Sequence, residues 1–169
     1  MSDDTARREH DRSEHDRRDR DRRERGLEMM RRVYGWDVED APGDFFGITV
    51  DHLFGDIWTR PGLGMRERRL LLIGVLAGQG LNDVLDIQIP AALANGELSP
   101  DELREIGVFL THYVGWPLGS RLCVQIDTLI ARHEKRARED REEAGRSPGR
   151  DHARPATRPD DAPTRTKDP

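Results

Sequence analysis

The feature that most constrains this sequence is a short corner between two helices at residues 95–102. Asn95-Gly96 is typical of a helix C-terminus, because these residues tolerate the left-handed backbone that ends a helix. Ser99 and Glu102 form a capping-box pattern, and Pro100 stands at the first position of the following helix. The sequence therefore predicts two helices joined by a short and well-specified corner.

Apolar residues recur every three or four positions from about Leu27 to about Ala137, which is the spacing of amphipathic helices. No alternating strand pattern of useful length occurs between these segments. The segment from Met65 to Gly80 becomes apolar nearly all round, which indicates a helix in the centre of a bundle or at a subunit contact. We predict an all-α bundle of about six helices that self-associates into an oligomer.

The two ends of the chain offer little for a core to bury. Residues 1–25 alternate Arg with Asp and Glu, and residues 141–169 are rich in Pro, Arg and Asp. Such segments do not offset the entropy of ordering, so we predict disordered tails, with a frayed helix as the alternative for the first. The helical domain is expected over residues 26–140.

Composition and motifs exclude several classes of protein. The net charge of -5 argues against a general nucleic-acid binder. No apolar run approaches the roughly 20 residues of a membrane span, and the N-terminus lacks the apolar core of a secretory signal. No metal spacing, phosphate loop, dinucleotide fingerprint or nucleophile elbow occurs. We therefore expect a cytoplasmic protein with no metal or cofactor and no nucleic-acid or membrane partner.

Three separated motifs carry a family resemblance. They are RPGLGMRERRLLLIGVLAGQG from Arg60, AALANGELSPDELREI from Ala91 and THYVGWP from Thr111. In this order and spacing, the chain resembles the carboxymuconolactone decarboxylase family from Phe54 to about Asp127. The resemblance implies an all-α subunit of a homotrimer or homohexamer with pockets among these helices. It also implies a lyase of aromatic-compound catabolism that binds a small-molecule substrate.

The family contains two chemical groups, which differ at one helix. Alkylhydroperoxidase D-type members carry a Cys-x-x-Cys pair there, but the only cysteine of this chain, Cys123, lies on a different helix and has no second thiol to resolve it. Decarboxylase members carry a histidine eight residues before the glycine of the Asn-Gly corner, and this chain has Gln88 there. Glutamine hydrogen-bonds a carboxylate or carbonyl but does not transfer a proton near neutral pH.

Decarboxylation without a cofactor needs a group that binds the carboxylate, a group that holds developing negative charge, and an acid. Gln88 is expected to orient the substrate, with a buried amide satisfied by a neighbouring helix end as the structural alternative. His112 is the first candidate for the acid, because histidine is a common general acid, unless it is a surface or interface residue. Glu67 is the second candidate for the acid. Its structural alternative is a carboxylate that stabilises the first turn of a helix through the helix dipole.

Aromatic and cationic side chains near the chain breaks are expected to bind the substrate. Aromatic residues beside Gly and Pro either wall a pocket or plug the core. An arginine either clamps a carboxylate or pairs with an acid at a subunit surface. The predicted substrate-binding residues are Trp58, Arg60, Tyr113 and Trp116.

The preferred hypothesis is a cofactor-free enzyme acting on a small carboxylate- or lactone-bearing molecule, by decarboxylation or related proton-transfer chemistry. The alternative is a non-catalytic oligomeric small-molecule-binding or scaffold protein on the same fold. An alkylhydroperoxidase-type peroxidase is a third hypothesis, which requires Cys123 to be essential.

Overall fold

The structure, a computed structural model, describes the backbone of residues 2–146, and this part of the chain is helical with no strand. The predicted all-α class of about six helices is confirmed. The elements in chain order are α1 (Ser2–Tyr34), α2 (Asp44–Ile48), the π-helix η1 (Thr49–Ile57), α3 (Met65–Gln79), α4 (Asn82–Ala94), α5 (Pro100–Val114) and α6 (Trp116–Arg146). None of the described helices combines the length and apolarity needed to cross a membrane.

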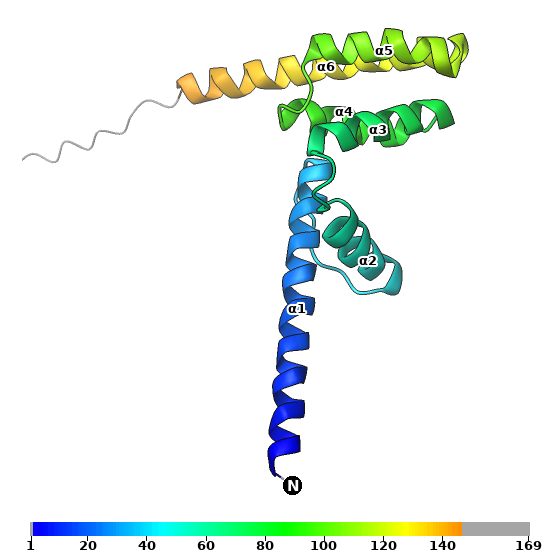
Figure 1. The fold of residues 1–169 in the computed structure, drawn as a ribbon. Helices are drawn as coiled ribbons and strands as arrows, with labels where there is room; N and C mark the ends of the chain where they lie inside the picture. The colour runs from blue at the N-terminus through cyan, green and yellow to red at the C-terminus, as the bar shows by residue number, and fades with distance from the viewer. Residues whose placement is uncertain (1, 147–169) are drawn as a thin grey trace, which may run out of the picture.

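Two helical layers lie across the end of α1 (Figure 1). The layer formed by α3 and α4 meets the C-terminal end of α1, and the layer formed by α5 and α6 packs on its other side. The short α2 and η1 lie beside the C-terminal half of α1. The chain therefore has an open, branched shape in which α4 contacts both α1 and α6.

Each part of this shape has its own apolar core. The larger core joins α3, α4, α5 and α6, and its fully buried side chains include Ile73, Ile89, Leu103 and Ile126. The smaller core joins α1 and η1. Gly26 of α1 permits the close approach of η1, because a Cβ at this position would collide with the backbone of Val50. The buried apolar positions follow helical spacing in both cores, as expected for amphipathic helices.

The corner between α4 and α5 has the predicted chemistry. Gly96 adopts a φ of 65°, which is favourable for glycine and strained for other residues. The backbone N–H of Glu102 donates to the Ser99 hydroxyl at 3.2 Å, and the backbone N–H of Ser99 donates to the Glu102 carboxylate at 2.8 Å. Pro100 occupies the first helical position, where no N–H is needed.

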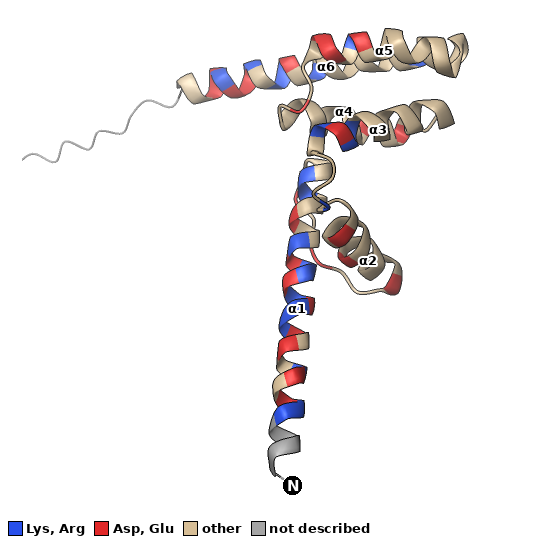
Figure 2. Ribbon diagram, in the orientation of Figure 1, with Lys and Arg blue, Asp and Glu red and all other residues tan. Residues whose placement is uncertain are grey.

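The ends of the chain are more helical than the sequence analysis expects. The sequence analysis predicts a disordered tail or a frayed helix for residues 1–25. In the structure α1 begins at Ser2, and basic and acidic residues alternate along it (Figure 2). Opposite charges one turn apart support it, as in the pair of Glu14 with Arg18 at 3.3 Å. Its packed C-terminal half supplies the nucleus from which further turns extend. At the other end α6 continues to Arg146, and residues 147–169 of the predicted C-terminal tail lie outside the described residues.

Candidate functional site

Gln88 belongs to a buried polar cluster where α1, α3, α4 and the α4–α5 corner meet. Only 2% of its surface is exposed, and its side-chain oxygen accepts a hydrogen bond from the Arg69 guanidinium of α3. Arg69 is fully buried and donates from Nε to a carboxylate oxygen of Glu97 at 2.7 Å. It also donates to the backbone carbonyl of Val33, at the end of α1, at 2.9 Å.

This cluster fixes Gln88 but leaves one of its groups free. Burial of the Arg69 charge is offset by the Glu97 carboxylate and by acceptors on each arm of the guanidinium. Asn95 holds Glu97 in turn, with a hydrogen bond of 2.9 Å. The Gln88 amide nitrogen donates no hydrogen bond to another residue that the structure describes. Gln88 therefore presents one donor from a fixed side chain and has no proton to transfer.

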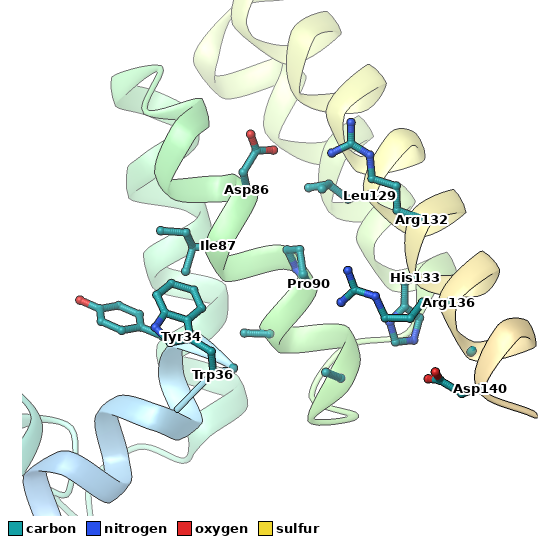
Figure 3. A pocket seen from close by; sticks show the side chains of 14 residues that line it. Tyr34, Trp36, Asp86, Ile87, Pro90, Leu129, Arg132, His133, Arg136 and Asp140 are labelled. Atoms are coloured by element: carbon teal, nitrogen blue, oxygen red, sulfur yellow. The ribbon is translucent and has the colours of Figure 1, made fainter. Parts of the chain in front are cut away.

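A groove of about 650 Å³ runs between α4 and α6 (Figure 3). Its apolar lining includes Ile87, Pro90 and Ala91 of α4 and Leu129 of α6. At the end of α1, Tyr34 and Trp36 complete the wall, and their rings stack with centroids 5.2 Å apart. Burial raises the pKa of the Tyr34 phenol, so this group stays neutral above its ordinary range.

The polar groups of the groove come mostly from one face of α6. Arg132, His133 and Arg136 line it, and Figure 3 shows both arginine side chains reaching toward α4. No hydrogen bond or ion pair joins any of these three residues to another residue in the described part of the chain. Asp86 and Asp140 also line the groove, and Asp86 accepts a hydrogen bond of 2.6 Å from the side chain of Gln125.

Three of the predicted site residues lie together where α5 turns into α6. His112 is exposed, and its Nδ1 lies 2.9 Å from the Val108 carbonyl of its own helix. Tyr113 and Trp116 are 75% and 73% exposed, and the Tyr113 ring packs on Phe109 with centroids 4.9 Å apart. These residues form an exposed aromatic end of the α5–α6 layer.

Three others lie on the segment that leads into α3. Trp58 is half-buried, stacks on Phe54 at 6.2 Å, and lines a shallow apolar hollow of about 290 Å³ with residues of α3. Arg60 is exposed, and its backbone carbonyl accepts a hydrogen bond from Arg68. Glu67 is exposed in the first turn of α3. Within one chain, the predicted site residues thus lie in three places, and neither of the two cavities above joins them.

The groove residues Arg132, His133 and Arg136 were not among the predicted site residues. The sequence held one usable signal, because His133 continues the apolar stripe of α6 through Leu129 at helical spacing. A titratable residue on a core-facing stripe indicates a polar environment on that face. The sequence analysis interpreted the charged residues around His133 as the fraying end of a helix and therefore did not select this face of α6.

Comparisons with known proteins give a consistent relationship. A model of the carboxymuconolactone decarboxylase family matches residues 43–121. The 4-carboxymuconolactone decarboxylase of Acinetobacter baylyi is 32% identical over 101 residues, which cover 55% of this chain and 75% of that protein. The nitrosuccinic acid decarboxylase npaB of Metarhizium robertsii is 31% identical over 70 residues, which cover 41% of this chain and 48% of that protein. The resemblance drawn from the three sequence motifs is confirmed.

Proposed function

The chain belongs to the carboxymuconolactone decarboxylase family, and on this basis we propose that it is a cofactor-free decarboxylase of a small carboxylate- or lactone-bearing molecule. The observation that carries the proposal is the similarity to two relatives that are both named decarboxylases. The helices α3, α4 and α5 lie within the matched segment 43–121.

The reaction sets clear demands on the site. The bond between the substrate carbon and its carboxylate breaks, carbon dioxide leaves, and the electron pair stays on the substrate. A hydrogen-bond donor stabilises the resulting oxyanion, and an acid then protonates the carbon. In our proposal Gln88 supplies the donor through its free amide nitrogen, because the hydrogen bond from Arg69 holds its oxygen.

His112 and Glu67 stay the proposed acids, and Trp58, Arg60, Tyr113 and Trp116 the proposed binding residues. Since these side chains lie on separate surfaces of one chain, a site that unites them requires a second subunit, and Gln88, which is 2% exposed, reaches such a site only if the packing around it opens. Large exposed apolar side chains on these surfaces support such an assembly, among them Leu71, Val75 and Phe109. We therefore include a homotrimer or homohexamer in the proposal, which light scattering on the purified protein measures directly.

One observation favours the second candidate, a non-catalytic small-molecule-binding protein. The resemblance implies a histidine of decarboxylase members at the position of Gln88, and the Gln88 oxygen is already bound to Arg69. A site without a titratable group at this position retains binding but loses one route of proton transfer. This candidate predicts that a bound ligand is recovered chemically unchanged.

The experiment compares carbon dioxide release from γ-carboxymuconolactone by the wild type and by Gln88→His. We expect protein-dependent release by the wild type and a faster rate for Gln88→His, which restores a titratable side chain. Gln79→His, an exposed glutamine on α3, is the matched control and should leave the rate unchanged. No release from either folded protein, with the lactone recovered intact, refutes decarboxylation of this substrate and favours the binding role.

A further inference from the structure

The outward face of α5 is apolar over its last turns, where the solvated face of a helix is normally polar. Its exposed residues recur at helical spacing and lie on the side of α5 opposite the buried Leu103: Val108, Phe109, His112 and Tyr113. We call these four residues the α5 surface. Large aromatic side chains such as Phe and Tyr are enriched at protein interfaces. The α5 surface therefore has the composition of a contact with another protein surface.

An apolar hollow of complementary character lies on the outward face of α3. It is the shallow hollow of about 290 Å³ that Trp58 lines, and we call it the α3 hollow. Leu71 and Val75 form part of its wall, although they are 61% and 53% exposed. Interfaces gain most of their affinity where an aromatic anchor fills an apolar pocket. The α3 hollow thus suits an aromatic side chain from outside the subunit.

The two surfaces carry opposite charges beside their apolar parts. Arg68 lines the α3 hollow, and Glu105 stands one turn before Phe109 on the exposed side of α5. Neither Arg68 nor Glu105 forms an ion pair with another residue in the described part of the chain. Complementary charges give specificity and fix the register of two docking surfaces. This favours contact of an α5 surface with an α3 hollow over contact between two α5 surfaces.

The predicted site residues are divided between the same two surfaces. Trp58 lines the α3 hollow, and Glu67 precedes Leu71 by one turn of α3. His112 and Tyr113 belong to the α5 surface, and Figure 1 shows α3 and α5 in different layers of the chain. Each surface therefore holds one candidate acid and one aromatic side chain of a single predicted site.

We propose that the α5 surface of one copy docks into the α3 hollow of a second copy, and that the two surfaces together form a composite ligand site. Phe109 and Tyr113 are the anchors, and Glu67 and His112 enter the site from different subunits. Because two different surfaces meet, the contact is heterologous and closes when the copies form a ring. The interface follows from the exposed surfaces alone, whereas the composite site also rests on the proposed function.

Sedimentation equilibrium on the full chain tests the interface. Val75→Glu and Phe109→Glu should each weaken association about tenfold or more, because each places a charge in an apolar contact. Val124→Glu is the matched control, since Val124 is an exposed valine of α6 that belongs to neither surface, and this variant should associate like the wild type. Circular dichroism checks that each variant is folded.

A charge exchange tests which two surfaces meet. Arg68→Glu and Glu105→Arg should each weaken association, and the double variant should regain most of the loss because the ion pair forms again in reverse. The interface is overturned if the wild type is monomeric at every concentration measured, or if folded Val75→Glu and Phe109→Glu associate like the wild type. A double variant that loses the sum of the two single losses also overturns it.

Mixed subunits test the composite site through carbon dioxide release. In our proposal Glu67→Gln and His112→Ala each disable one half of the site, so an equal mixture that is dissociated and reassembled contains some contacts with both halves intact. Random assembly around heterologous contacts leaves about one contact in four intact, so about a quarter of the wild-type rate should return.

The outcomes separate the composite site from the proposed function. Single variants that keep the wild-type rate, or mixed oligomers that recover no release, overturn the composite site. No release by the wild type refutes the proposed function instead, and the association measurements then decide the interface.

Discussion

Replacing Arg69 with methionine should destabilise the protein strongly, because Arg69 connects three helices from a fully buried position. The change preserves most of the side-chain volume but removes the positive charge beside Glu97. It leaves that carboxylate, which is 5% exposed, without its buried partner. The carbonyl of Val33 and the oxygen of Gln88 also lose their donor.

The expected loss follows from the burial of both charges. Removing one partner of a buried ion pair typically costs about 3–5 kcal/mol, and we predict a loss in this range for Arg69→Met. The double variant Arg69→Met, Glu97→Leu should lose less than Arg69→Met alone, since well-packed apolar residues often replace a buried pair without penalty. The exposed pair of Arg104 with Asp127 is the matched control, and Arg104→Met should cost less than about 1 kcal/mol.

Urea denaturation followed by circular dichroism at 222 nm measures these free energies of unfolding. All variants are compared at one protomer concentration, because self-association adds to apparent stability. The reasoning is refuted if Arg69→Met loses no more than Arg104→Met, or if the double variant is as unstable as the sum of its two single variants.

Two further predictions concern the α5–α6 layer. Gly119→Ala should destabilise the protein by about 1–3 kcal/mol in thermal unfolding, because the added Cβ would lie 2.6 Å from Thr111 Cα. Gly62→Ala is the control and should be nearly neutral, because the space around Gly62 is open. Hydrogen bonding to the Ser99 backbone N–H is the largest cause that lowers the pKa of Glu102 to about 2. Its stabilisation is therefore fully present above the ordinary pKa of 4.5 and is lost as the pH falls through about 2. The difference in melting temperature between wild type and Glu102→Gln should be present at neutral pH and disappear in that acidic window; a difference that persists at pH 2 contradicts this assignment.

Much of the fold was predictable because its signals are local. Gly96, Ser99 and Glu102 set the α4–α5 corner through backbone conformation and capping, and each depends on residues only a few positions away. Gln88 lies on an apolar stripe of α4 and is buried, as its spacing indicated. The sequence analysis preferred a substrate-binding role for it and kept an amide bound by a helix end as the alternative, whereas its oxygen is bound by the Arg69 side chain. The identity of its partner was harder to predict, since Arg69 stands within the charged segment RERR at the start of α3.

The groove was not predictable by the same reasoning. The groove exists only because α6 continues past its apolar stripe and lies against α4, which is a tertiary arrangement. A charged run at the end of a helix is most often solvated, so periodicity alone gave no reason to select Arg132 or Arg136. The positions of His112 and Glu67 on separate surfaces also depend on how the two helical layers stack.

The most direct test of the decarboxylase assignment is the initial rate of carbon dioxide release from γ-carboxymuconolactone, measured by membrane-inlet mass spectrometry on the purified, folded wild type. The account predicts release above the spontaneous rate, in proportion to protein concentration. A rate equal to that of the protein-free solution contradicts the account for this substrate.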